Sequence, residues 1–356
     1  MKANDNLNPI LSQKKPWSDN ANPIWLASTV TLLRNIEKYK FPAKLSSDRK
    51  KQIIALVSKD LLEMEGIEHP FLVKGEELGF LEKEFLIEHF LSTHNYNQAH
   101  VGEGFILDKT GEFLVTLNMR DHIHLQLIDC KGELENTWSR LVNIETGLGK
   151  RLNYSFTPKF GFLTSDPTQC GTGLIVAVYL QVPGLVHSGQ IDEMLEKHLD
   201  DTLDISGIQG NPTEIIGDVI VVHNNYTLGI TEENIISTLR NFTTKMMVEE
   251  NSARSKIKRD DNAEFKDKVS RAFGILTHSY KIEAVEALNA LSLLKLGAEA
   301  DWIKGIDNKQ LNELFFNCRR AHLLRHYSQE KINQEEIPHK RAEYIHTALK
   351  HLKLMI

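Results

Sequence analysis

Three side chains that could bind a metal or transfer a proton lie close together in the sequence, at Asp121, His122 and His124. Because side chains alternate along a strand, His122 and His124 would share one face and Asp121 would point to the other. A protein zinc site takes three or four ligands, and no third ligand for that face is evident. We therefore favour a hydrogen-bonded pair of structural histidines over a metal site.

A second candidate is the turn Gly171-Thr172-Gly173, which precedes an apolar run at 174–180. Glycines at such a turn let a ligand or another backbone segment approach closely. A lone Gly-x-Gly pattern is more often an ordinary tight turn than a phosphate-binding loop. Other motifs must decide between these two interpretations.

The composition argues against several classes of protein. The chain has 356 residues with 42 basic and 48 acidic side chains, a net charge of −6, so no overall field favours nucleic acid or an anionic membrane. The cysteines Cys130, Cys170 and Cys318 are far apart and lack the spacing of a zinc site or a redox pair. No apolar run approaches the ~20 residues of a membrane span, and no signal pattern begins the sequence. We expect a cytoplasmic protein that binds neither nucleic acid nor membrane.

The spacing of apolar residues predicts an α+β fold that positions these candidates. Helical spacing, as at Ile53, Val57 and Leu61, prevails in the first part of the chain and returns after Thr231. Between them, apolar residues alternate with polar ones, as in half-buried strands of a mostly antiparallel sheet flanked by helices. We predict a flexible lead-in at 1–22, a small N-terminal helical lobe at 23–100, a sheet domain at 101–255 and a C-terminal helical domain at 256–356.

Longer motifs point to one family. The stretch 160–174, Phe-Gly-Phe-Leu-Thr-Ser-Asp-Pro-Thr-Gln-Cys-Gly-Thr-Gly-Leu, is similar to the signature of the phosphagen (ATP:guanidino) kinases. Segments 28–35, 118–122 and 224–229 resemble further landmarks of that family, in the same order. The resemblance extends over 25–350, and the helical tail is most similar to that of the bacterial protein-arginine kinases, which phosphorylate arginine side chains on proteins.

This resemblance implies a fold of the glutamine synthetase/guanidino kinase type, with the catalytic site in the sheet domain. It implies that arginines hold the phosphates of magnesium-ATP, because their forked donors match phosphate oxygens. It also implies a glutamate that orients and deprotonates the substrate guanidinium. The C-terminal helical domain would form a dimer and a pocket for phosphoarginine.

At most of the matched nucleotide positions this chain carries a different residue type. The family's phosphate-binding arginines match Thr29, Thr31, His124, Ile175 and Ser206, none of which carries a fixed positive charge. A family histidine in the helical lobe matches Phe90. The positions matched to the nucleotide site are Ser28, Thr29, Val30, Thr31, Phe90, His124, Gly171, Thr172, Gly173, Ile175, Val176, Ala177, Val178, Tyr179, Ser206, Gly207, Ile208, Gln209, Gly210 and Asn211.

The position matched to the catalytic glutamate is Arg120, with Asn118, Asp121 and His122 as neighbours. A guanidinium cannot accept the substrate proton and would repel the substrate. Asp166 replaces a family cysteine and adds negative charge where an anionic cosubstrate would lie. On this interpretation no catalytic residue is retained.

Two matched motifs keep an arginine. Arg34, which precedes Asn35, belongs to the framework end of the first motif, so we expect it to have a structural role. In the tail, Arg341 and Ala342 are the remnant of a phosphoarginine-binding pattern, Arg-Asp-x-x-Arg-Ala. Because the rest of that pattern is gone, we favour a solvated helix residue for Arg341 over an anion ligand.

From these substitutions we expect a pseudokinase that keeps the fold and acts as a scaffold or regulator in protein quality control. The alternative is a divergent but active protein-arginine kinase that uses Arg120, His122, His124 and Lys159 as replacement cations. A module that binds arginine-rich or phosphorylated partners also stays open. We expect no cofactor unless the family activity survives, in which case ATP and Mg²⁺ are required. The resemblance further implies a homodimer and two partners, a zinc-binding kinase activator and a protein-unfolding ATPase machinery.

Overall fold

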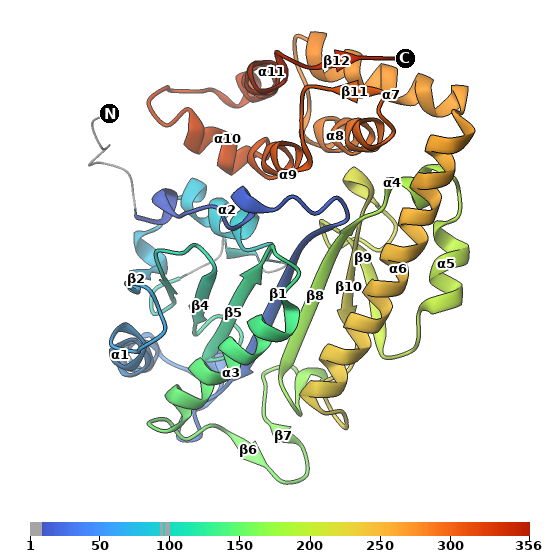
Figure 1. The fold of residues 1–356 in the computed structure, drawn as a ribbon. Coiled ribbons are helices and arrows are strands. Elements are labelled where there is room, and N and C mark those ends of the chain that lie inside the picture. The colour runs from blue at the N-terminus through green and yellow to red at the C-terminus, as the bar shows by residue number, and fades with distance from the viewer. Residues whose placement is uncertain (1–8, 93–94, 97–99) are drawn as a thin grey trace. The chain divides into compact units, whose positions relative to one another are not determined.

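The computed structural model describes residues 9–92, 95–96 and 100–356 (Figure 1). Its central element is an eight-stranded sheet with the order β2-β3-β4-β5-β1-β8-β10-β9. The pairs β2–β3, β3–β4, β4–β5 and β1–β5 are antiparallel. The strands are β1 (Trp25–Arg34), β2 (Phe71–Lys74), β3 (Gly104–Leu107), β4 (Phe113–Leu117), β5 (Ile123–Asp129), β8 (Leu174–Gln181), β9 (Leu203–Gly207) and β10 (Val219–Asn224). This confirms the predicted large, mostly antiparallel sheet flanked by helices.

The central strands are more deeply buried than the alternation of apolar residues predicts. Every residue of β4 and β5 is buried, including the polar ones. α3 (Leu134–Gly149) packs against β5. The Gln126 amide of β5 donates a hydrogen bond of 2.7 Å to the carbonyl of Phe90, at the end of α2 (Phe80–His89). The prediction of half-buried strands is therefore wrong for β4 and β5, whose polar side chains are buried as well.

By its contacts the chain divides into two compact units. Unit 1 contains Ser28–Ala177, His223–Leu239 and the described part of Met1–Pro16. Unit 2 contains Trp17–Ala27, Val178–Val222 and Arg240–Ile356. The domain limits predicted at residues 100 and 255 stay a prediction.

Besides α2 and α3, unit 1 contains a further helix nearer the start of the chain. α1 (Ser47–Leu62) begins where the Ser46 hydroxyl accepts the Arg49 amide, and its apolar stripe is buried. The region 23–100 is not wholly helical as predicted, because it also holds β1 and β2. β1 is buried along almost its whole length, so its sequence lacks the alternation that identifies a strand. The other elements are η1 (Pro9–Ser12), η3 (Pro42–Lys44), η4 (Gly75–Glu77), η6 (Pro167–Gln169) and the hairpin strands β6 (Phe156–Thr157) and β7 (Gly161–Phe162).

Unit 2 is mainly helical. The long helix α6 (Glu232–Asp260) begins in unit 1 and ends where Asp261 adopts a positive φ of 47°. The Asn262 side chain then caps α7 (Ala263–His278) by accepting the Glu264 amide. The remaining elements are η2 (Pro16–Asp19), α4 (Pro183–His187), α5 (Ile191–His198), η7 (Ile216–Asp218), α8 (Ala284–Glu299), α9 (Asn308–Asn317), α10 (Arg320–His326), η8 (Gln334–Glu336), α11 (Ile337–Leu349) and the paired strands β11 (Ile303–Lys304) and β12 (Lys353–Leu354).

The lead-in predicted as loose is packed over 9–22, while residues 1–8 lie outside the described part. Trp17 is fully buried; its ring stacks on Phe316 at 4.6 Å, and its indole N–H donates to the Asn317 side chain at 3.3 Å. The Asn20 amide donates to the carbonyls of Trp25 and Leu26. The segment was predicted to be loose because most of its residues are polar. Its few large apolar side chains are buried, and the free energy of their burial outweighs the entropic cost of ordering the chain.

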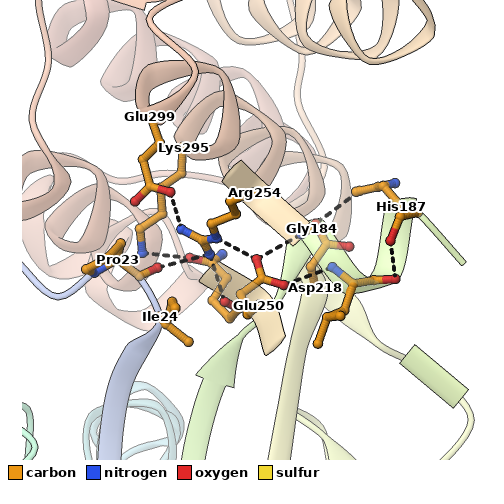
Figure 2. Close-up of polar contacts among 12 residues, drawn as sticks. Pro23, Ile24, Gly184, His187, Asp218, Glu250, Arg254, Lys295 and Glu299 are labelled. Carbon is orange, nitrogen blue, oxygen red and sulfur yellow. Dashed lines mark hydrogen bonds and ion pairs between the residues drawn. The ribbon is translucent and has the colours of Figure 1, made fainter. Parts of the chain in front are cut away.

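A buried network of charges lies within unit 2 (Figure 2). The Glu250 carboxylate accepts the amides of Gly184 and Leu185 at 2.9 and 2.8 Å, together with the Arg254 guanidinium. Burial raises the pKa of Glu250 in spite of these partners. Lys295 is fully buried as well, and burial lowers the pKa of its amine well below the usual range. These groups connect α4, α6 and α8.

None of the described helices combines the length and the apolar composition needed to span a membrane.

Candidate functional site

Asp121 organises the turn between β4 and β5. Its Oδ1 accepts the side-chain amide of Asn35 and the backbone amide of Ser165, each at 2.6 Å. Its Oδ2 lies 3.3 Å from Nε2 of His124. Burial alone would raise the pKa of Asp121, but the hydrogen bond and charge of His124, with the bonds from Asn35 and Ser165, lower it to about 2. Asp121 is therefore an ionised framework carboxylate.

His122 has both ring nitrogens occupied. Its Nδ1 accepts the Ile36 amide at 3.0 Å, so Nε2 carries the proton and donates to the Lys40 carbonyl at 2.9 Å. Burial lowers the pKa of His122, which keeps the ring neutral at pH 7. His122 lies just before β5 and His124 lies within it, and each has its own hydrogen-bond partner, as expected for structural histidines. The expectation that Asp121 points away from His124 is wrong, because Asp121 precedes the strand and its carboxylate contacts the His124 ring. Across the described residues, no three His, Cys, Asp or Glu side chains come together in a group that could hold a metal.

Arg120 and Asp166, which the sequence gives no reason to connect, form an ion pair. Arg120 NH2 lies 3.3 Å from Asp166 Oδ2, with side chains 51% and 30% exposed. The Ser165 hydroxyl donates to the Arg120 carbonyl. Hydrogen bonds from Thr168, and then the charge of Arg120, lower the pKa of Asp166. The guanidinium at the matched glutamate position is thus held by the carboxylate at the matched cysteine position.

The glycines of the 171–173 turn are required by packing. Gly171 has φ 108°, and a Cβ there would lie 2.1 Å from the Thr227 carbonyl oxygen. Gly173 has φ 59°, and its Cβ would lie 2.9 Å from the Leu33 carbonyl oxygen. The Thr172 amide also donates to Thr227 O at 2.9 Å. The backbone of the chain itself lies against these glycines. Packing within the protein therefore explains why glycine occupies both positions, without a bound ligand.

Arg34 is the guanidinium that contacts this turn, and its Nε and NH1 are bonded within the protein. It is 1% exposed; Nε donates to Glu145 at 2.6 Å, and NH1 donates to the carbonyls of Leu33 and Thr172 at 2.8 and 2.9 Å. Its Cζ atom lies 3.6 Å from the centre of the Phe162 ring. The predicted structural role of Arg34 is confirmed. No other guanidinium contacts the turn among the described hydrogen bonds and ion pairs.

The other matched positions in unit 1 lie on β1 and β8, except for Phe90 at the end of α2. Ser28 donates to Asp129 at 3.1 Å, Thr29 is buried opposite Ile128, and Val30 is completely buried. The remaining matched positions are the half-buried Thr31, Ile175 and Ala177 and the fully buried Phe90 and Val176. None of them presents a cation.

The matched positions in unit 2 are the buried Val178 and Tyr179 of β8 and the turn 206–211. In that turn the Gly207 amide donates to the Asn211 carbonyl at 2.8 Å, and a Cβ on Gly207 would lie 1.9 Å from the Glu214 carbonyl oxygen. The Asn211 side chain accepts bonds from Thr213. The members of this turn are Ser206, Gly207, Ile208, Gln209, Gly210 and Asn211. The turn is held by its own backbone and by Glu214 and Thr213.

Comparison with known proteins identifies the family. The model of the ATP:guanido phosphotransferase C-terminal catalytic domain matches residues 52–253, and that of the protein-arginine kinase McsB C-terminal domain matches 262–355. The protein-arginine kinase of Chlamydia pneumoniae is 32% identical over 348 residues, covering 96% of each chain. This chain belongs to the protein-arginine kinase family. The protein-arginine kinase of Halothermothrix orenii is also 32% identical, over 97% of each chain.

Solved structures agree on the fold of this family member. Lombricine kinase matches with a TM-score of 0.58 at 17% identity, covering 68% of this chain and 73% of that one. The duplicated taurocyamine kinase from Schistosoma mansoni matches with a TM-score of 0.58 at 22% identity, covering 69% of this chain and 35% of that one. Both support the guanidino kinase type of fold.

The protein-arginine kinase tail pattern is reduced to Arg341 and Ala342, and both are buried. Arg341 is 2% exposed; its Nε donates to the Cys318 carbonyl at 2.8 Å and its NH1 to the Ile282 carbonyl at 2.9 Å. The expectation of a solvated residue is therefore wrong for Arg341, because its guanidinium satisfies carbonyls between helices. The same bonds leave it poorly placed to receive a phosphoarginine.

The residues at the matched positions do not fit magnesium-ATP as the family holds it. At the positions that the sequence resemblance matches to the motif's arginines stand threonine, isoleucine, serine and a histidine bonded to Asp121. The buried Arg34 already donates to Glu145 and to the carbonyls of Leu33 and Thr172. Sequence reasoning missed Glu145 and Thr227, which fix Arg34 and the glycine turn. Thr227 lies within the matched segment 224–229 and Glu145 lies in no matched motif, but each acts on a segment far away in the chain, so the sequence does not show its role.

Proposed function

We propose that this member of the protein-arginine kinase family is a pseudokinase. The observation that carries the proposal is the pairing of Arg120 with Asp166 at 3.3 Å, at the positions matched to the catalytic glutamate and a family cysteine. A guanidinium at this position can neither accept a proton from an arginine substrate nor attract that substrate. The charge at the position matched to the catalytic glutamate is therefore positive instead of negative.

The loss of phosphate-binding cations supports the same proposal. Phosphoryl transfer depends on fixed positive charge around the transferring group. If each missing donor weakens transition-state binding by roughly 2–4 kcal/mol, the loss of two slows transfer by about a thousand-fold or more. Thr29, Thr31, His124, Ile175 and Ser206 stand at the matched arginine positions.

The role that fits an inactive family member is that of a scaffold or regulator in protein quality control. The proposal includes a cytoplasmic homodimer that meets the zinc-binding kinase activator and the protein-unfolding ATPase machinery expected from the family resemblance. Its basis is the match over both family models, which cover the chain from 52 to 253 and from 262 to 355.

The second candidate is an active, divergent protein-arginine kinase with replacement cations, and the exposed Lys159 is the observation that favours it. The other three cations of that hypothesis have partners within the protein: Arg120 pairs with Asp166, His122 bonds Lys40, and His124 bonds Asp121. One free lysine is a weak substitute for several forked donors.

Calorimetric titration of the full-length protein with magnesium-ATP, paired with mass spectrometry for phosphoarginine on incubated protein substrates, tests the proposal. We expect neither nucleotide binding nor phosphoarginine. Tight nucleotide binding together with phosphoarginine formation would establish the active kinase instead.

A restored variant with T29R, T31R, R120E, H124R, I175R and S206R is expected to regain nucleotide binding. Its control is S237R/N241R/T244R, which changes the net charge by the same amount on exposed positions of α6. If the restored variant folds and binds no more nucleotide than the control, the residue matching is wrong.

A further inference from the structure

A basic and aromatic surface of unit 1 surrounds the Arg120–Asp166 pair. We call it the basic face and define it by Lys38, Lys40, Arg120, Phe156, Lys159 and Phe160. Its hairpin, β6–β7, projects at the lower edge of the view in Figure 1. Phe156 is 57% and Phe160 44% exposed, and all four cations are exposed. Phe156 and Phe160 thus form an exposed apolar pair among cations, a composition that suits a binding surface.

Backbone bonds make this surface continuous. Ile36 bridges Tyr154, and the Ser155 amide donates to the Asn35 carbonyl at 2.7 Å, so the segment with Lys38 and Lys40 runs beside the segment that enters the hairpin. The Lys40 carbonyl accepts the His122 ring at 2.9 Å, two residues from Arg120.

The hairpin is anchored on the site from its other side as well. The Leu163 amide donates to the Ser155 carbonyl at 2.9 Å, and the Ser165 hydroxyl donates to the Arg120 carbonyl. Gly161 forms a bridge with Gly171 of the glycine turn. The basic face therefore lies on the same rigid framework as the matched catalytic positions.

The charge of the basic face is uncompensated. Lys38, Lys40 and Lys159 form no ion pair with any described residue, and only Lys159 has a ring contact, with its Nζ 5.1 Å from the centre of the Phe160 ring. Glu37 is exposed among them, and Arg120 is balanced by Asp166. A local excess of positive charge thus remains on a chain whose net charge is −6. A partner of opposite charge would be attracted to this surface.

We propose that the basic face binds an acidic segment of a protein partner that also carries apolar side chains. This inference rests on the proposed function: a site that has lost its carboxylate and gained a guanidinium is suited to carboxylates rather than to arginine. Lys38, Lys40 and Lys159 pair with the partner's carboxylates, and Phe156 and Phe160 receive its apolar side chains. A carboxylate of the partner competes with Asp166 for Arg120.

An acidic protein segment fits this surface better than nucleic acid does. Nucleic-acid affinity comes from many phosphate contacts, and this surface offers three unpaired lysines with Glu37 among them. The two phenylalanines lie on one short hairpin and offer apolar contacts that a single acidic peptide can use together with the lysines.

The test uses fluorescence anisotropy with the full-length protein and a short fluorescein-labelled peptide of alternating glutamate and phenylalanine. The comparison ligands are a peptide of alternating glutamate and serine, a peptide of alternating lysine and phenylalanine, an oligo(U) RNA and a second copy of the unlabelled protein. We expect the glutamate–phenylalanine peptide to bind best and its affinity to fall as salt is raised.

The charge-reversal variant K38E/K40E/K159E should weaken binding by about ten- to a hundred-fold. Its control, K245E/K256E/K331E, makes the same charge change at exposed lysines of unit 2 and should leave binding within about twofold. The F156S/F160S variant should weaken binding of the glutamate–phenylalanine peptide and leave the glutamate–serine peptide unaffected.

The inference is overturned if no acidic peptide binds, if the charge-reversal variant and its control behave alike, or if RNA, the basic peptide or a second copy of the chain binds better. Magnesium-ATP titration and phosphoarginine detection on the same protein keep the two proposals distinct. Kinase activity would refute the proposed function, whereas absence of peptide binding in an inactive protein would refute this inference alone.

Discussion

Removal of Arg254 should expose how much of the stability of unit 2 depends on its buried charges. Arg254 on α6 is 6% exposed; it donates to Glu250 and Glu299, and also to the Gln181 and Pro23 carbonyls at 3.0 and 3.4 Å (Figure 2). Arg254→Met keeps most of the volume and removes all of these donors. Glu250, which is completely buried, then retains only the amides of Gly184 and Leu185.

We expect Arg254→Met to lower the free energy of unfolding by roughly 3–5 kcal/mol at pH 7, since a buried carboxylate loses its counter-charge. Burial already raises the pKa of Glu250 above its unfolded value, and the loss of Arg254 raises it further. A carboxyl whose folded pKa is raised destabilises the protein as pH rises above its unfolded pKa. The deficit of the variant should therefore be larger at pH 8 than at pH 5.

The measurement is urea denaturation followed by far-UV circular dichroism and by tryptophan fluorescence, because Trp17, Trp25 and Trp302 all lie in unit 2. The double variant R254M/E250Q, which removes the orphaned charge, should recover part of the loss. Arg259→Met on the same helix is the control, as that side chain is 74% exposed and pairs only with its neighbour Asp260. A single variant as stable as the control, or a double variant less stable than the single one, would show that this network does not stabilise unit 2.

Three further predictions concern unit 1. Asp121→Asn should destabilise the protein by roughly 2–3 kcal/mol above pH 4, because the folded pKa of Asp121, about 2, lies below its unfolded value. Urea midpoints of the variant and the parent protein should converge as pH falls from 4 to 2. A stability difference independent of pH would contradict the role of Asp121. Arg34→Met should cost roughly 3–5 kcal/mol by leaving Glu145 without its counter-charge; hydrogen exchange should report a loosened 171–173 turn, and unchanged protection would count against this reasoning. Gly171→Ala should lower the free energy of unfolding by roughly 3 kcal/mol, because the added Cβ would lie 2.1 Å from the Thr227 carbonyl oxygen. The control is Gly189→Ala, where φ is 70° and no atom lies within 4 Å of the added Cβ, so the loss of stability should be smaller. Equal thermal stability of the two variants would refute the packing argument.

The amino-acid sequence by itself determined the family and the fold class. Those features are local: a glycine turn before an apolar run, alternation at β4, helical stripes in α1 and α8, and a contiguous motif at 160–174 can all be recognised without knowing what lies opposite them. The structural role of Arg34 was also predicted, because it lies at the framework end of its motif.

Only the tertiary structure decided how the substituted residues combine. Arg120 and Asp166 lie 46 positions apart in the sequence and become an ion pair because Ser165 bonds the turn that carries Arg120. The sequence did not predict β1, because a strand buried on both faces lacks the alternation of apolar and polar residues. The prediction for Arg341 was wrong because the carbonyls that its guanidinium bonds lie on other segments. The physical reason is the same in each case: burial, hydrogen bonding and charge pairing depend on residues distant in sequence, and no local pattern records them.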